Sequence, residues 1–211
     1  MVIYSVEQAI NKANFDIKEE NVIFILSSTK GNINLLNTKN EDTKAIYLSS
    51  SVDKIAKYFH LKNSPIVVCN ACTSGASAII LAHRLLEKEK YDYAVVCGAE
   101  EQSKFIFSGF QSLQALSPFE CKPFDINRLG LNLGEASATV VLCNEKVKCK
   151  HNLSWSIKDG AIRNDSSHIT NPSKNGTGLT MALSAVIEQE DLNDSASINV
   201  HGTATMFNDQ M

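Results

Sequence analysis

Residues 66–78 read IVVCNACTSGASA, and this stretch decides the fold of the chain. It opens as a short β-branched run, which predicts a buried strand, and it continues through small residues into a helical pattern. Small residues permit a sharp turn there, and the first turn of the helix offers unpaired backbone N–H groups and a partial positive charge. A thiolate at Cys72 is favoured in that position, and the same N–H groups could stabilise an oxyanion on an attacked thioester.

The local pattern leaves three interpretations of Cys72 open. The first is a nucleophile, and the second is a small residue that only packs in the turn. The third is a redox pair, because Cys69 and Cys72 form a CxxC motif and a thioredoxin-like motif also opens a helix after a strand. A metal site has less support, since neither a second CxxC nor a His pair completes a set of four ligands.

Outside this stretch, β-branched runs alternate with helical patterns, which indicates an α/β protein with buried, largely parallel strands. The predicted strands are 22–26, 66–69, 93–97, 138–142, a weaker one at 155–159, and 198–201. The predicted helices are 4–14, 51–59, 79–86 and, less regularly, 181–186. Residues 31–43 are rich in Asn, Lys and Thr and are predicted to form an exposed loop.

The composition excludes several classes of protein. The 211 residues are 44% hydrophobic and 20% charged, which predicts a globular protein with a real core. The formal net charge of -3 provides no basic stripe, so we expect no nucleic-acid partner. No apolar run approaches the ~20 residues of a membrane-spanning helix, so we expect no membrane role. Three of the six cysteines lie in apolar strand-like runs, which predicts a reducing, cytoplasmic environment.

Five ordered blocks carry a family resemblance. They are ACTSGA at 71–76, FQSLQALS at 110–117, KPFDINRLGLNLGE at 122–135, NDSSHITNP at 164–172 and VHGTAT at 200–205. A single block would be a weak match, but five in the expected order are specific. The chain resembles the middle part of a β-ketoacyl-acyl carrier protein synthase, a condensing enzyme of the thiolase-like family.

The resemblance implies an architecture. It is the thiolase-like α/β fold, mainly its first half plus the opening strand of the second half. Residues 1–211 would form a partial β-ketoacyl synthase domain, with the nucleophile half at about 1–145 and the start of the second half at about 146–211. The N-terminal start and the C-terminal part of the family, with its second catalytic His, its Lys and the rest of its oxyanion hole, would lie outside the chain. We therefore expect the chain alone to be incomplete for activity.

The resemblance also implies a reaction, the decarboxylative Claisen condensation. Cys72 would take an acyl group from acyl carrier protein, and the carbanion formed when malonyl-carrier protein loses CO2 would attack the acyl-Cys72 thioester. His201 would stabilise the enolate. The matching substrate-binding residues are Phe110, Thr170, Asn171, Thr203 and Thr205. No metal or redox cofactor is expected, because the malonyl carboxylate supplies the carbanion.

The expected partners are acyl carrier protein and a second synthase subunit, in a homodimer or in a heterodimer with a related chain, paired near strand 66–69.

In the third block, Gly130 and Gly134 are interpreted as turn residues, and Asp125 and Arg128 as an ion pair or turn residues. Two alternatives stay open: a thiolase-like acyltransferase that uses coenzyme A thioesters, and a non-catalytic partner subunit. The presence of Cys72 disfavours the second. The pathway, whether fatty acid, polyene pigment or polyketide, also stays open.

Overall fold

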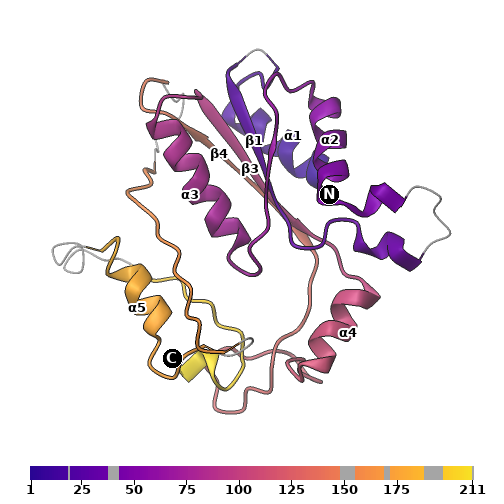
Figure 1. Ribbon diagram of the computed structural model, residues 1–211, viewed down its shortest axis with the longest axis vertical. Helices are drawn as coiled ribbons and strands as arrows, with labels where there is room; N and C mark the ends of the chain where they lie inside the picture. The colour runs from indigo at the N-terminus through magenta and orange to yellow at the C-terminus, as the bar shows by residue number, and fades with distance from the viewer. Residues whose placement is uncertain (19, 38–42, 148–154, 169–171, 188–196, 211) are drawn as a thin grey trace. The chain divides into compact units, whose positions relative to one another are not determined.

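The computed structural model describes residues 1–18, 20–37, 43–147, 155–168, 172–187 and 197–210 (Figure 1). They gather in two compact units. The first comprises Met1–Phe105 and Gly134–Lys158, and the second comprises Ile106–Leu133 and Asp159–Met211. The division of the family domain at about residue 145 stays a prediction.

The first unit is built on a four-stranded sheet. Its strands are β1 (Val22–Ser27), β2 (Ile66–Val68), β3 (Tyr93–Glu100) and β4 (Ala136–Cys143), in the order β2-β1-β3-β4. β1 is parallel to β2 and to β3, with Ile25 opposite Ile66 and Val22 opposite Tyr93. The edge strand β4 runs antiparallel to β3. Four of the six expected strands are confirmed, and one of them, at the edge, is antiparallel.

Helices cover both faces of this sheet (Figure 1). Side chains alternate between the faces of a strand, so Phe24 and Leu26 pack toward α1 (Val2–Ala13) and α2 (Leu48–Phe59). Ile23 and Ile25 pack on the opposite face, against α3 (Ser74–Glu87). α3 presents Ala78 and Ala82 to the sheet, and these small side chains let the helix lie close to β1 and β3.

The second unit holds most of α4 (Lys104–Ser112), together with α5 (Thr177–Leu183) and the short 3₁₀ helix η4 (Asn208–Gln210). A β-bridge joins Leu116 to Leu131. Beside it, Gly130 has a φ of +131°, and a Cβ at this position would lie 2.5 Å from the carbonyl oxygen of Ala115. A side chain cannot fit there, so close backbone approach requires a glycine at this position. Neither Gly130 nor Gly134 lies in a turn, so the interpretation of both as turn residues is wrong.

Several expectations from the sequence are wrong. Residues 155–159 form no strand, and Trp155 is 98% exposed. Residues 198–201, the expected opening strand of the second half, also form no strand, and Ile198 and Val200 are exposed. A β-branched run becomes a strand only when a neighbouring strand pairs with it, and the described residues provide none at either place.

The other differences concern helices. The expected loop at 31–43 contains the 3₁₀ helix η1 (Ile33–Asn37), and a second, η2 (Thr43–Ile46), begins at its end. α4 was not expected. α5 ends at Leu183, before the last residues of the predicted segment 181–186. Short helices of this kind depend on tertiary packing more than on local propensity.

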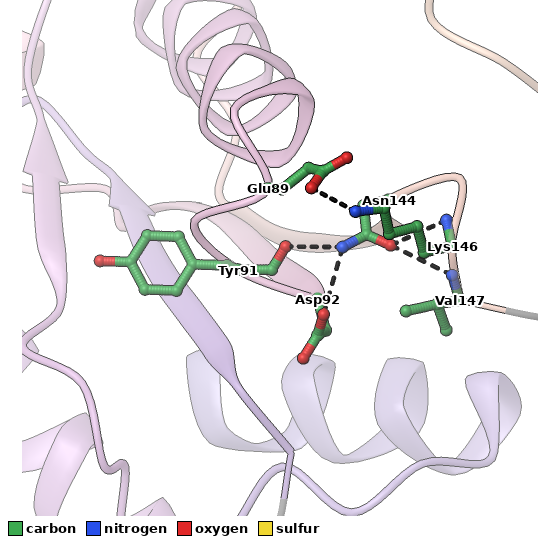
Figure 2. Close-up of polar contacts among 6 residues, drawn as sticks. All are labelled: Glu89, Tyr91, Asp92, Asn144, Lys146 and Val147. Carbon is green, nitrogen blue, oxygen red and sulfur yellow. Dashed lines mark hydrogen bonds and ion pairs between the residues drawn. The ribbon is translucent and has the colours of Figure 1, made fainter.

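A buried amide ties the end of β4 to the turn before β3 (Figure 2). Asn144, only 7% exposed, donates from Nδ2 to the carbonyl oxygen of Tyr91 at 3.0 Å and to the Asp92 carboxylate at 3.2 Å. Its Oδ1 accepts from the backbone N–H groups of Lys146 at 3.0 Å and Val147 at 3.1 Å. Nearby, the Lys146 ammonium forms an exposed ion pair with Glu89. The amide therefore satisfies four polar groups at one corner of the sheet.

The two interactions at this corner should differ in their effect on stability. Asn144→Ala leaves buried polar groups unpaired, so we expect it to lower the free energy of unfolding by about 1–3 kcal/mol. Lys146→Ala removes only an exposed ion pair and should cost less than about 1 kcal/mol. Urea unfolding of the chain, followed by far-UV circular dichroism, measures both. Equal losses in the two variants would contradict the role assigned to Asn144.

Candidate active site

The turn between β2 and α3 is held by one buried hydroxyl. Ser74, which is 4% exposed, accepts the backbone N–H of Asn70 at 2.7 Å and donates to the carbonyl oxygen of Ala71 at 2.6 Å. The N–H of Thr73 also donates to the carbonyl oxygen of Asn70 at 3.1 Å. Ala71 has a φ of +45°, a left-handed conformation that costs an L-residue about 1–2 kcal/mol. The surrounding hydrogen bonds hold the turn in this shape.

Cys72 lies in this turn, two residues before α3, with an exposed and free thiol. In the first turn of the helix, the N–H groups of Gly75 and Ala76 have no hydrogen-bond partner among the described residues. Both residues are exposed. The turn therefore combines an accessible thiol with the partly positive end of a 14-residue helix, as the sequence predicted.

A carboxylate at the end of β3 fastens the loop beside this turn. One oxygen of Glu100 accepts the backbone N–H of Thr29, and the hydroxyl of Ser28 lies 3.5 Å from the same oxygen. Thr29 in turn accepts a weak bond from the Cys69 thiol at 3.8 Å. The second Glu100 oxygen, Oε2, is buried without a partner in the described part of the chain. Sequence analysis missed Glu100, although a carboxylate at the end of a buried parallel strand is a usable signal.

His201, the second expected catalytic residue, lies exposed in the second unit. The next residue, Gly202, has a φ of +55°, and a Cβ there would lie 3.1 Å from the Phe124 ring and 3.4 Å from Pro123. The third and fifth matched blocks therefore pack together at Gly202, the residue after His201. Cys72 belongs to the first unit, so its expected cooperation with His201 stays a prediction.

Arg128 donates hydrogen bonds both to its own block and to the segment that follows His201. Its guanidinium donates to the carbonyl oxygen of Asp125 at 2.9 Å, and to those of Thr205 and Met206 at 3.4 Å each. The Asp125 carboxylate accepts the N–H of Asn127 at 2.7 Å. Arg128 and Asp125 therefore act as turn residues, and Arg128 also holds the segment after His201.

Asp209 fixes the same segment and was missed from the sequence. Its carboxylate accepts the N–H of Phe124 at 2.8 Å. Burial alone would raise the pKa of Asp209, but hydrogen bonds from Phe124, the Asn208 side chain, Ala204 and Thr203 lower it. The carboxylate thus gathers backbone N–H groups from both blocks. Its position eight residues after His201 is the only trace of this role in the sequence.

The expected substrate-binding residues are placed in part. Thr203 and Thr205 lie together, with their hydroxyl oxygens 2.9 Å apart. Phe110 is half-buried in α4. Thr170 and Asn171 lie outside the described residues. Phe110, Thr203 and Thr205 belong to the second unit, and the role of all five residues in binding substrate stays a prediction.

The cysteines give a mixed result. Cys69, Cys72, Cys97 and Cys121 are free thiols, and Cys97 is completely buried in β3. Cys143 is disulfide-bonded, so the expectation of reduced thiols fails at that residue.

Within the described ranges, no three His, Cys, Asp or Glu side chains gather in a group that could hold a metal ion. No described helix combines the length and the apolar character needed to cross a membrane.

Comparison with known proteins gives the family. The family described as "Beta-ketoacyl synthase, N-terminal domain" matches residues 6–148. The 3-oxoacyl-[acyl-carrier-protein] synthase 2 of Synechocystis sp. is 28% identical over 239 residues, which cover 96% of this chain and 55% of the relative. The tetracenomycin polyketide synthase ketoacyl synthase alpha subunit of Streptomyces glaucescens is 31% identical over 156 residues, which cover 68% of this chain and 36% of the relative.

Solved structures agree with this assignment. A ketosynthase from Xenorhabdus doucetiae, in complex with its chain length factor, matches with a TM-score of 0.78 and 26% identity, over 99% of this chain and 54% of that one. A β-ketoacyl synthase from Burkholderia phymatum shares the fold with a TM-score of 0.82 and 24% identity, over 98% of this chain and 57% of that one. The chain spans about half the length of the Synechocystis relative. It belongs to the β-ketoacyl synthase family and has the thiolase-like α/β fold of that family.

Proposed function

We propose that the protein is a β-ketoacyl-acyl carrier protein synthase and that this chain carries its nucleophile. The exposed, free Cys72 at the start of α3 is the observation that supports the proposal most. The reaction is the decarboxylative condensation of an acyl-Cys72 thioester with malonyl-carrier protein. A non-catalytic partner subunit would not need this thiol.

The two candidate catalytic residues act in different steps of this proposal. Cys72 attacks the incoming acyl thioester, and the unpaired N–H groups of Gly75 and Ala76 place partial positive charge beside it. His201 donates a hydrogen bond to the enolate oxygen that forms when malonyl-carrier protein loses CO2. Thr203 and Thr205, with Thr170, Asn171 and Phe110, contact the arm that carries the substrate. The chemistry requires neither a metal ion nor a redox cofactor.

The proposed partners are acyl carrier protein and a second synthase subunit, either an identical chain or a related one. β2 supports the second partner, because this edge strand of three half-buried residues leaves one side of the described sheet unpaired. The ketosynthase from Xenorhabdus doucetiae was solved with such a partner, its chain length factor. A cytoplasmic location is also part of the proposal; the free thiols of Cys69, Cys72, Cys97 and Cys121 favour it, and the disulfide-bonded Cys143 counts against it.

The exposure of the thiols predicts an order of alkylation. Cys72 is exposed beside a helix N-terminus, whereas Cys97 is completely buried, so iodoacetamide should label Cys72 well before Cys97. Timed labelling of the folded chain, followed by peptide mass mapping, measures the order. The half-buried Cys121 should fall between them. An inert Cys72 in folded protein would remove the nucleophile assignment.

The two catalytic residues should separate the half-reactions in the intact protein. Cys72→Ala should abolish acyl loading from labelled acyl-carrier protein. His201→Ala should retain loading but reduce release of labelled CO2 from malonyl-carrier protein on the order of a hundredfold to a thousandfold. His168→Ala, an exposed histidine without an assigned role, is the control and should retain both steps. Full CO2 release by His201→Ala would show that another group stabilises the enolate.

The lowered pKa of Asp209 predicts how the segment after His201 responds to acid. A carboxylate whose pKa is lower in the folded than in the unfolded protein stabilises the folded state. This stabilisation is complete above the unfolded pKa of 3.8 and is lost as the pH falls through the lower pKa of the folded state. Amide protection of Phe124 and Ala204 should therefore persist to pH 3.8 and weaken below it. Hydrogen exchange followed by NMR measures this. Asp209→Ala should lose the protection at every pH, while Asp159→Ala, which removes an exposed carboxylate, should not.

A further inference from the structure

The turn that holds Cys72 also presents a second thiol, Cys69, which the proposed condensation does not use. Cys69 is the first residue after β2 and, like Cys72, it is free and exposed. Two residues separate the thiols, and this spacing is the one at which CxxC pairs close a disulfide in other proteins. The arrangement of strand, CxxC and helix start is therefore present here on an accessible surface.

Few contacts hold the Cys69 thiol in place. The Cys69 thiol has one weak bond, to the carbonyl oxygen of Thr29 at 3.8 Å. A thiol is a poor donor, so this contact costs little to break. The turn itself is held by bonds of Ser74 and Thr73 with backbone groups of Asn70 and Ala71, and it uses neither sulfur. None of the hydrogen bonds that hold the turn is therefore made by the sulfurs that would be joined.

We propose that Cys69 is a resolving thiol, which converts oxidised Cys72 into a reversible Cys69–Cys72 disulfide. The oxidant is a hydroperoxide. The Cys72 thiolate attacks one oxygen of it, so an S–O bond forms and the O–O bond breaks. Hydroxide or an alkoxide leaves and is protonated by water, the sulfur is oxidised to a sulfenic acid, and the peroxide is reduced. The Cys69 thiol then loses its proton, and its thiolate attacks the Cys72 sulfur. The S–S bond forms as the S–O bond breaks, and the released hydroxide takes up the proton from Cys69 and leaves as water.

The consequence is protection of the proposed nucleophile. Without a neighbouring thiol, a cysteine sulfenic acid proceeds to sulfinic and sulfonic acids, which thiol reductants do not reverse. With Cys69 in the same turn, oxidation stops at a disulfide that blocks acyl transfer until it is reduced. This inference rests on the proposed role of Cys72 as the reactive thiol, and it adds a redox control of that residue.

A single tryptic peptide contains both thiols, so its mass shows whether the Cys69–Cys72 disulfide forms. Trypsin cuts after Lys62 and Arg84, and residues 63–84 contain Cys69 and Cys72 and no other cysteine. After hydrogen peroxide treatment of the folded chain, this peptide should lose two hydrogens and take up no iodoacetamide. Dithiothreitol should restore both labels. Cys69→Ser should instead accumulate added oxygen on Cys72 and fail to recover, while Cys121→Ser should behave as the unaltered chain.

Three results would overturn the inference. The first is oxygen added to Cys72 in the unaltered chain to the same extent as in Cys69→Ser. The second is a disulfide that joins two chains. The third is that both thiols still react fully with iodoacetamide after peroxide treatment. Because the readout is the mass of one peptide, its failure is distinct from failure of the condensing function. A protein that loads acyl groups on Cys72 but forms no disulfide would lose only the redox role of Cys69.

Discussion

The burial of β1 on both faces is the constraint on which the first unit depends. All six residues of this strand are buried, so helices must cover both sides of it and strands must pair with both of its edges. Alternation along the strand then assigns Phe24 and Leu26 to α1 and α2, and Ile23 and Ile25 to α3. The parallel pairing of β2 with β1 brings the end of β2, and hence the turn of Cys72, to the same edge as the end of β1.

At that edge the backbone leaves regular structure, and polar groups hold it. Ser74 bonds the backbone of the turn that holds Cys72, and Glu100 holds the loop after β1 through Thr29. The Ser74 side chain satisfies backbone groups that the sheet and the helix leave unpaired. Cys72 is therefore exposed on a turn whose backbone groups are hydrogen-bonded, which favours a reproducible position of its thiol. The left-handed conformation of Ala71 persists because these bonds maintain it.

The second unit is held together differently, since its described residues contain no strand pairing beyond the bridge of Leu116 and Leu131. Its organisation comes from Arg128, which donates to carbonyl groups, and Asp209, which accepts from N–H groups. Together they connect residues 122–128 with residues 201–209. Charged side chains in these roles form stronger hydrogen bonds than neutral ones, and they suit irregular backbone near an exposed histidine.

The sequence by itself determined the four strands, three of the helices, and the turn between β2 and α3 that holds Cys72, because each has a local pattern of apolar spacing or small residues. The ordered blocks also identified the family. Tertiary structure alone decided that residues 198–201 form no strand, that β4 runs antiparallel, and that Asp209, Arg128 and Glu100 hold the loops around the candidate residues. These outcomes depend on which distant segments meet. Strand pairing and side-chain bonds to distant backbone leave no periodic signal in a single sequence.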